Sequence, residues 1–436
     1  MSAPTIEVGI ALGVGSDTDF ILDDPIRGVL DSTFTLGTGY TDVTSSTFRC
    51  SITRGRFSEL TRPIEAGDII INLNNEDRAF DPAHLGSPYV TNLAPGRGLQ
   101  IKAGGKTIVT GFVEDWNLEY DVSGRSVAMC MATDALGVLA AGEFDEWTST
   151  KLTAGGKLSD ICNRAEIDWP ATLRDFDDGV EALQSDAVSW GSNALNYAQL
   201  VAQSELGYLF ASSDGMLTFR DRLIGSSPSS VSFSDDGGTF ESVLTDTDGD
   251  PLLDEFGEPL TANVDTIAYE SISATVGSER LYSRVGVDRE GGINQTATVA
   301  DPAAWRLENG PLRSLTIPTT LLASDARSLA LAQFLLSLYD TPRYMVSDVA
   351  VELATLSASQ QDSVLAIDIA SVIDVSYTPN GVGAPIMQRL VVQGIRHDVA
   401  PMTHTVSFST IPAPAQHFRL DSAVYGVLDG IYKLAF

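Results

Sequence analysis

The stretch Ser51-Ile-Thr-Arg-Gly-Arg56 opens a spaced pattern that runs to residue 116 and decides the fold prediction. The later groups combine glycine, proline and aspartate with short apolar runs. They are Ala66-Gly67, Leu73-Asn-Asn-Glu-Asp-Arg-Ala-Phe-Asp-Pro82, Ser87-Pro-Tyr89, Pro95-Gly96-Arg97 and Thr110-Gly-Phe-Val-Glu-Asp-Trp116. None of them is a catalytic motif, and such residues are typical of turns and strand ends. The pattern therefore predicts a small β-domain with many defined turns.

Individual residues of this pattern have structural explanations. Gly55 and Gly67 allow the backbone to turn or bulge where a Cβ atom would clash, so replacing either by valine is expected to impair folding. Arg78 lies between two aspartates and can hold its loop by charged hydrogen bonds. Trp116 ends a strand, where its ring can cover the core of the domain.

Composition limits the function classes. The chain has 436 residues, enough for about two to four domains, and 43% of them are hydrophobic, so it can bury substantial cores. Its 27 basic and 58 acidic residues give a formal charge of −31 at pH 7. Nucleic-acid affinity comes largely from Lys and Arg that neutralise phosphates, so a nucleic-acid groove is not expected as the main function.

The cysteines and the start of the chain point to a protein made in the cytoplasm. Cys50, Cys130 and Cys162 are too few and too far apart for a disulfide framework or a zinc site. Cys50 and Cys130 lie in strand-like patterns, where a small buried side chain is favoured over a bridge. No signal peptide begins the chain, and no stretch approaches the ~18 apolar residues of a membrane span.

Periodicity divides the chain into β-rich and helical parts. Residues 69–74 and 126–131 alternate with period 2, as half-buried strands do, with a hairpin turn at 121–124. Helices are expected at 157–165 and 192–206, the second with an N-cap at Ser192 or Asn193 and Gly207 at its end. A strand, turn and strand follow at 208–219. A second β-rich part begins at 263 and contains one helix at 325–338, capped by Ser324.

Two groups deserve comparison with metal sites. Asp246-Thr-Asp248-Gly-Asp250-Pro fails the spacing of an EF-hand calcium loop, so an acidic hairpin turn is favoured, with a weakly held surface cation left open. The histidines are His84, His397, His404 and His417. Only His397 and His404 can face each other on adjacent strands, and ordinary strand positions are favoured over a metal site because no cysteine lies nearby.

No catalytic constellation is present. Hydrolase and peptidase motifs are lacking. Gly13-Val-Gly15-Ser16 is not a dinucleotide fingerprint, because Thr18 stands where the third glycine belongs. Adjacent aspartates such as Asp177-Asp178 are expected by chance in so acidic a chain. We therefore predict no enzyme, and no catalytic, cofactor-binding or metal-binding residues.

The whole array resembles one family, the tail-tip (baseplate) hub or minor tail proteins of long-tailed actinobacteriophages. The resemblance covers about residues 30–412 and extends beyond the 51–116 pattern. The further groups are Leu195-Asn-Tyr-Ala-Gln-Leu200, Glu205-Leu-Gly-Tyr-Leu-Phe210, Asp214-Gly215, Tyr282-Ser-Arg-Val285, Asn309-Gly-Pro-Leu-Arg313 and the helix before Tyr339. In this order the groups are more specific than any one of them alone.

The resemblance implies a mainly β fold with a small α+β insert and two tube-like β-barrel domains. The expected division is an N-terminal segment 1–30, a first barrel 31–141, an α+β insert 142–225, a loop or hairpin 226–262, a second barrel with one helix 263–412 and a C-terminal extension 413–436. The extension is expected to dock on a neighbour.

The resemblance also implies a structural role in a virion. Three copies would form a ring at the tail tip that closes the tail tube, binds the distal tail protein and other minor tail or receptor-binding proteins, and conducts the tape measure protein and DNA. DNA would only pass through. If three copies of so acidic a chain surround a channel, its wall is expected to be neutral to acidic; the alternative is that the acidic residues lie on the outside and keep the particle soluble. Alternatives are a hexameric distal tail protein, a tail-associated peptidoglycan hydrolase and a free-standing carbohydrate-binding β-protein.

Overall fold

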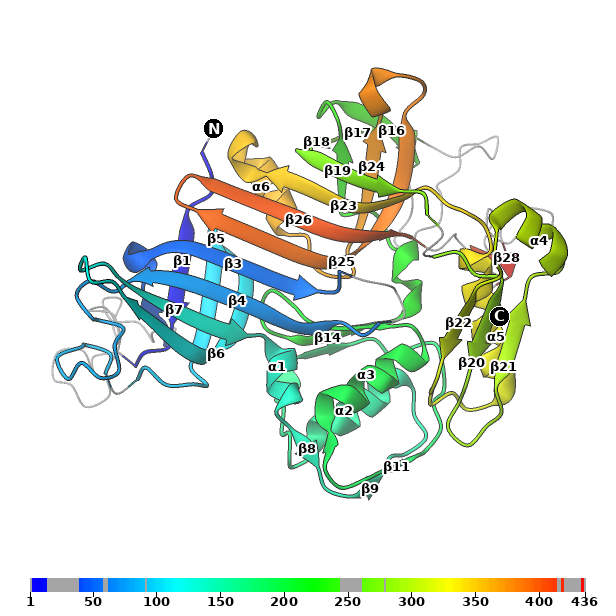
Figure 1. Cartoon of the computed structure of the whole chain (residues 1–436), viewed down its shortest axis with the longest axis horizontal. Coiled ribbons are helices and arrows are strands. Elements are labelled where there is room, and N and C mark those ends of the chain that lie inside the picture. Colours follow the sequence, from blue (N-terminus) through cyan, green and yellow to red (C-terminus); the bar gives the residue numbers. More distant parts are fainter. Residues whose placement is uncertain are drawn as a thin grey trace.

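The protein is mainly β, with helices in two small modules and beside the sheet (Figure 1). The computed structural model describes residues 2–13, 39–57, 62–90, 92–243, 261–277, 280–413, 417–418 and 433–434. Within these residues, no helix combines the length and the apolar character needed to cross a membrane. The predicted fold class is confirmed in its main feature, a β protein with a few helices.

One sheet of 14 strands forms the centre of the molecule. Its path runs β18–β15–β24–β25–β3–β4–β7–β6–β5–β1–β2, and a branch β26–β23–β19 leaves from β25. The strands are β1 Ile6–Ile10, β2 Thr41–Asp42, β3 Thr47–Gly55, β4 Glu65–Asn74, β5 Gly98–Ala103, β6 Lys106–Tyr120, β7 Ser126–Thr133, β15 Val231–Ser234, β18 Ile267–Ala268, β19 Ser271–Thr275, β23 Met345–Glu352, β24 Val372–Tyr377, β25 Ile386–Ala400 and β26 Thr403–Pro412. We call strands β1 to β7 the first β unit, and β15, β18, β19 and β23 to β26 the second β unit.

The two tube-like barrels predicted from the sequence do not close into cylinders in the described part of the chain. The strand pairings form an open, branched path. The reason lies in β3, whose two edges pair with β4 and with β25 of the second unit. The edge that a closing strand would need is therefore used to join the units.

The period-2 strands of the first unit are confirmed. Ile69, Ile71 and Leu73 of β4 are fully buried. In β7 the buried positions include Ala128 and Cys130, and the methionines between them lie on the other face. The alternation thus located the strand, although the larger side chains of β7 point away from the core.

The loop between β4 and β5 is held as the sequence predicted. Arg78 donates two hydrogen bonds to Oδ2 of Asp81, at 2.9 and 2.6 Å. The Tyr120 hydroxyl donates to the same oxygen at 2.8 Å, and these bonds lower the pKa of Asp81 to about 2. The ring of Phe80 stacks on that of Trp116, with centroids 6.1 Å apart, so Trp116 covers the core at this loop. The prediction that Trp116 ends its strand was wrong, because β6 continues to Tyr120.

An α+β module connects the two units. Its elements are α1 Ala135–Ala140, β8 Glu143–Phe144, β9 Trp147–Thr148, α2 Ala154–Asn163, β10 Arg174–Phe176, β11 Ala187–Val188, β12 Ser192–Asn193, α3 Ala194–Ser204, β13 Tyr208–Ala211 and β14 Leu217–Arg220. The N-cap of α3 is Asn193, whose side chain accepts from the Asn196 amide. Gly207 was expected to end this helix in a left-handed conformation, but Leu206 has the positive φ of 61°. Gly207 instead leaves room for the ring of Phe219, because a Cβ atom there would lie 2.4 Å from it.

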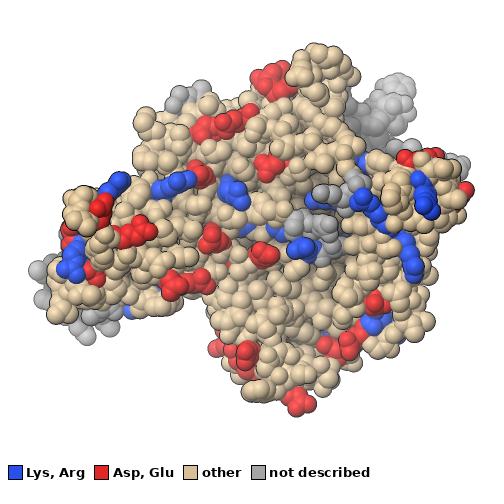
Figure 2. Space-filling view, viewed as in Figure 1, with Lys and Arg blue, Asp and Glu red and all other residues tan. Residues whose placement is uncertain are grey.

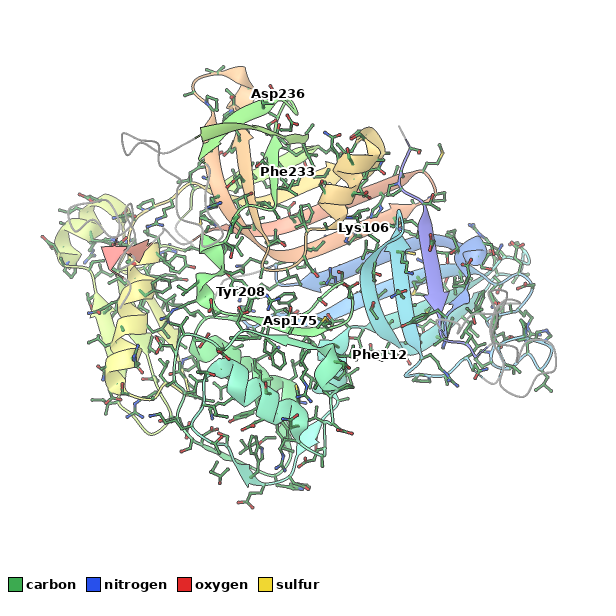
Figure 3. All side chains as sticks on the ribbon, turned by 180° about the vertical axis from the view of Figure 1, so that it is seen from behind. Lys106, Phe112, Asp175, Tyr208, Phe233 and Asp236 are labelled. Atoms are coloured by element: carbon green, nitrogen blue, oxygen red, sulfur yellow. The ribbon has the colours of Figure 1, made fainter. Side chains whose placement is uncertain are left out.

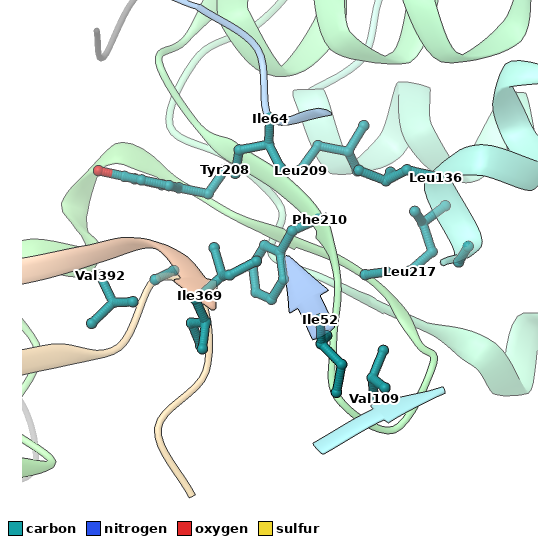
Figure 4. Close-up of a cluster of buried hydrophobic side chains, with 14 of the residues drawn as sticks. Ile52, Ile64, Val109, Leu136, Tyr208, Leu209, Phe210, Leu217, Ile369 and Val392 are labelled. Atoms are coloured by element: carbon teal, nitrogen blue, oxygen red, sulfur yellow. The ribbon is translucent and has the colours of Figure 1, made fainter. Parts of the chain in front are cut away.

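Side chains of this module lie in a core that both units share. Figure 4 shows Phe210 and Leu217 of the β13–β14 hairpin beside Ile52 of the first unit and Ile369 of the second. All four are buried, with at most 3% of each residue exposed. The insert therefore packs between the units, and apolar burial there favours one fixed arrangement of the three parts.

A second small module lies between β19 and β23. It contains β20 Arg284–Val287, β21 Gln295–Thr298, α4 Pro302–Asn309, β22 Ser314–Ile317 and α5 Asp325–Tyr339. Outside it, β16 Thr239–Val243 and β17 Thr261–Asp265 precede β18, and α6 Ala358–Leu365 follows β23. The last two strands, β27 His417–Phe418 and β28 Lys433–Leu434, lie near the C-terminus. The predicted helix is confirmed as α5, capped by Ser324. The expectation of one helix was wrong, since α4 and α6 also form. Each has a clear N-cap, but α4 buries only Trp305, so its apolar periodicity is weak.

The expected hairpin at 226–262 is found in part as the β16–β17 ladder. The acidic group at 246–258, together with most of the N-terminal segment and of the C-terminal extension, lies outside the described residues.

Gly55 and Gly67 are both constrained, for different reasons. Gly55 has φ +94°, and a Cβ atom would lie 2.3 Å from the Gln393 carbonyl oxygen. Gly67 has no positive φ, but it lies where the register of β3 against β4 shifts, between the pairs Thr53–Asp68 and Gly55–Glu65, so the bulge explanation agrees with the structure. A Cβ atom there would lie 2.6 Å from Oδ2 of Asp134, which caps α1.

We predict that Gly55→Ala lowers the free energy of unfolding by on the order of 3–5 kcal/mol, since left-handed strain and a backbone clash add. Gly124→Ala is the matched control, because Gly124 has φ +91° but open space around its Cβ position. It should lose only about 1 kcal/mol. Urea unfolding of both variants measures the difference, and equal losses would contradict the close-approach argument.

Candidate assembly surface

A single strand, β25, joins the two β units. Its first part, Ile386–Val391, pairs with β24, and its later part, Gly394–Val399, pairs with β3 of the first unit. Its other edge pairs with β26 from Leu390 to Ala400, with a bulge between Val392 and Gly394. A bulge bends a strand and increases its twist, which lets β25 leave one partner for the next. We call the β25–β3 ladder the joint.

Gly55 marks the end of the joint. It lies opposite Gly394, and the amide of Arg56 donates to the Gln393 carbonyl at 2.9 Å. The two chains approach so closely here that any side chain at position 55 would meet the backbone of β25. The glycine predicted from sequence to mark a turn or bulge lies at a register shift between β3 and β4, and contact with the other unit also requires it.

Two buried arginines hold the joint and the insert together. Arg54 is 2% exposed; its Nη1 donates to the Ala211 carbonyl of the insert at 3.0 Å, and its Nη2 lies 3.0 Å from Oδ1 of Asp368 in the second unit. Arg56 donates to the Gln393 side chain at 2.5 Å, and its guanidinium lies over the ring of Tyr208. Removing one partner of such a buried charge costs roughly 3–5 kcal/mol.

A pair of buried histidines lies on the inner side of the same sheet. Nδ1 of His397 and Nε2 of His404 are 3.0 Å apart on β25 and β26, as the sequence predicted for facing strands. The His404 amide donates to Glu352 at 3.1 Å. Burial and mutual repulsion lower the pKa of His397, and burial lowers that of His404 to about 4. Both rings are therefore neutral at pH 7.

These histidines do not form a metal centre with other ligands. In the described ranges, no group of three or more His, Cys, Asp and Glu side chains is arranged to hold a metal ion. The three cysteines are free and buried, as expected for Cys50 and Cys130.

One buried polar cluster was missed by the sequence analysis. Nζ of Lys157 lies 2.5 Å from Oγ of Ser149 and 3.0 Å from Oδ1 of Asp186, which also accepts from the Tyr197 hydroxyl at 2.9 Å. Lys157 and Ser149 are each 1% exposed. A substrate cannot reach a serine so deeply buried, and the groups satisfy one another, so the cluster fixes α2 and α3 in the insert. A lysine among the apolar positions of a helix was its only sequence signal.

The joint produces one continuous face across both units. The strands β19, β23, β26, β25, β3, β4 and β7 lie side by side, and β1, β5 and α6 cover the rear, as seen from behind in Figure 3. Outward positions that stand opposite one another along these strands are mainly small or polar. They are Ser273, Asp348, Ala350, Thr405, Ser407, Ser409, Arg396, Asp398, Ser51, Thr53, Asp68, Ile70, Asn72, Met129 and Met131.

The charges on this open face are mostly acidic. Figure 2 shows mainly uncharged side chains over these strands, with acidic residues scattered between them. Of the basic side chains there, Arg49 lies 3.1 Å from Asp398, and Arg396 lies over the ring of Phe57. The described residues of this face therefore provide no continuous row of basic side chains for a nucleic acid to bind.

The comparisons with known proteins agree with this architecture. The tail protein from Neisseria meningitidis MC58 superposes with a TM-score of 0.55 at 13% identity, over 93% of this chain and 96% of that chain. The 43 kDa tail protein of prophage MuSo2 from Shewanella oneidensis gives a TM-score of 0.54 at 14% identity, over 94% of this chain and 99% of that chain. The chain has the fold of these phage tail proteins. No protein-family model matches the sequence, and no curated protein matches it either.

The histidine pair predicts a pH dependence of stability. The folded pKa of His404, about 4, lies below its ordinary value of 6.5, so its contribution to stability is present above pH 6.5 and is lost as the pH falls toward 4. We expect the wild type to lose on the order of 3 kcal/mol more than His404→Gln between pH 7 and pH 4. Urea unfolding of both proteins at the two pH values measures this, and parallel losses would contradict it.

Proposed function

We propose that this chain is a structural tail-tip (baseplate) hub protein of a long-tailed phage virion, with no enzymatic activity. Three copies form a ring that closes the distal tail tube. The ring joins the distal tail protein to other minor tail or receptor-binding proteins, and it conducts the tape measure protein and DNA. The likeness of fold to two phage tail proteins over nearly the whole chain supports this proposal.

The observation that carries the proposal is a repeat of strand order within the chain. Five strands of the first unit follow one another in sequence as β3, β4, β5, β6, β7, and five strands of the second unit as β19, β23, β24, β25, β26. In space, the first is ordered β5–β6–β7–β4–β3, and the second β24–β25–β26–β23–β19. Every neighbouring pair in both series is antiparallel. The chain therefore contains the same five-stranded unit twice.

The longest strands of the two units correspond in detail. Both β6 and β25 have 15 residues, and each changes partner near its middle. Each also has a bulge there, between Val113 and Asp115 in β6 and between Val392 and Gly394 in β25. A tube with six-fold symmetry requires six equivalent units, and three copies of a chain with two units supply them. The two tube-like domains of the family are proposed to correspond to these units.

The main alternative is a hexameric distal tail protein. Six copies of this chain would place twelve five-stranded units around the axis, which does not match a six-fold tube. The repeat thus favours three copies. A peptidoglycan hydrolase is not favoured, because the buried serine and lysine of the insert have no access to a substrate.

The open face formed by β19, β23, β26, β25, β3, β4 and β7 is proposed to line the channel. Its hydroxyl and carboxylate groups would give DNA no cationic sites, so few counterions would have to be released or taken up during passage. The virion tail tip is the corresponding location, after synthesis in the host cytoplasm.

The trimer is the first test. Native mass measurement of the purified protein, or copy counting in virions, is expected to give three chains per complex. Six copies, or a strict monomer together with no trimer in virions, would contradict the proposal.

DNA binding is the second test. In a filter or gel-shift assay at 50 mM salt, we expect no tight binding of double-stranded DNA by the assembled protein, because phosphates would meet acidic and neutral side chains. A variant with Ser51→Lys and Ser407→Lys, which adds two cations per chain to the open face, should gain salt-sensitive binding. Tight, salt-sensitive binding by the wild type would contradict the proposed wall.

A further inference from the structure

We infer that neighbouring copies join by strand pairing, in which the free edge of β19 in one copy pairs with the second half of β6 in the next. This interface would repeat between chains the joint that β3 and β25 form within one chain. It rests on the proposed ring and identifies the surfaces that build it.

The repeat defines which residues correspond. The first pairs after the bulges are Asp115 with Met131 and Gly394 with Ser409, so Asp115 corresponds to Gly394. From there, Asn117 corresponds to Arg396. Asn117 and Glu119 are exposed, as Arg396 and Asp398 are, and Leu118 between them is more buried, as His397 is.

The other two edge strands correspond as well. Through their partners β4 and β23, Ser51 of β3 corresponds to Ser273 of β19. The sequences then read Ser51-Ile-Thr-Arg-Gly55 and Ser273-Ala-Thr-Val-Gly277. Serine, threonine and glycine recur at the same places, and the second glycine stands where Gly55 ends the joint. The strand pairings alone assign Ser51 to Ser273, so the recurrence of the same residue types in the sequence is a separate observation.

Both edges named in the inference lack a strand partner among the described residues. β19 pairs only with β23, and β6 beyond its bulge pairs only with β7. Their counterparts β3 and β25 are paired on both edges. An unpaired edge attracts other strands, and a closed ring removes it. The two edges lie at opposite ends of the sheet that the joint makes continuous, so one copy can use both at once (Figure 1).

Exposed apolar side chains lie at the same two edges. Tyr120, at the end of β6, is 55% exposed, and Val276, just after β19, is 62% exposed. Their counterparts are Val399, which is 6% exposed, and Arg54, which is 2% exposed, and both are buried at the joint. Apolar surface that the single chain exposes would thus be covered by the next copy.

The in-chain joint also supplies the register. Arg396 stands opposite Thr53, and Asp398 stands opposite Ser51, in antiparallel pairing. By correspondence, Asn117 of one copy stands opposite Thr275 of the next, and Glu119 stands opposite Ser273. The interface joins two different edges, so it is heterologous and forms a ring when the rotation closes.

Disulfide trapping in the full-length protein tests the register. Cysteines at directly opposite positions of antiparallel strands lie within bridging distance, at about 4.5–5.5 Å between Cα atoms. We expect the double variant Asn117→Cys with Thr275→Cys to shift under mild oxidation from the one-chain to the three-chain band on a non-reducing gel. The control is Asn117→Cys with Ser273→Cys, which moves one cysteine by two residues and places the pair roughly 7–8 Å apart. All three positions are exposed, and the control should stay at the one-chain band.

The outcomes separate the interface from the ring. A native trimer in both variants, with no bridging in the first or equal bridging in the control, would overturn the inferred edge and leave the proposed ring standing. Bridging that stops at two chains would also overturn it, because it indicates a two-fold interface. Absence of a wild-type trimer both in solution and in virions would refute the proposed function and the inference with it.

Discussion

The pairing of β25 with β3 is the constraint on which the rest of the structure depends. A strand has two edges, and β25 gives one to β26 and divides the other between β24 and β3. The division converts two five-stranded units into one sheet. It also requires that the backbones of Gly55 and Gly394 meet without a side chain between them. The insert then has a defined place, because Arg54 reaches from the joint to Ala211.

Burial of charge at the joint is tolerated because each charged group has a fixed partner. An isolated guanidinium in this position would be costly, whereas Arg54 is paired with Asp368 and with a carbonyl oxygen. The histidines solve the same problem differently, since both stay neutral and bond to each other. These polar contacts are directional, so they specify one relative placement of units that apolar packing alone would specify less sharply. A component of the proposed ring would need such rigidity, because small angular errors in each chain would prevent closure.

The sequence predicted local structure well and long-range pairing poorly. The strands around Ile69 and Ala128, the cap of α5 and the Arg78–Asp81 contact follow from nearest-neighbour rules, and the structure confirms them. The joint could not be foreseen, because alternation shows that β3 is a strand but not which strand lies beside it. Gly55 was correctly selected, yet its reason, the approach of Gln393, depends on a residue far away in sequence. The internal repeat was hidden for the same reason: strand order persists while only Ser, Thr and Gly recur at the edge. The buried Lys157 had no local rule that distinguishes it from a surface lysine.

Carrying two units in one chain changes how a six-unit ring can assemble. The covalent connection and the joint place two units in contact at the high effective concentration of an intramolecular pair. In the proposed ring of three chains, three of the six contacts would be present before any chains meet, and only three would form from solution. Because the internal contacts no longer depend on association, their residues could diverge toward buried arginines and a histidine pair. The β19 edge keeps Ser273 and Thr275 where β3 has Ser51 and Thr53, and it differs where Val276 stands in place of Arg54. The difference between Arg54 and Val276 is then the expected result of one interface becoming permanent while its counterpart stays reversible.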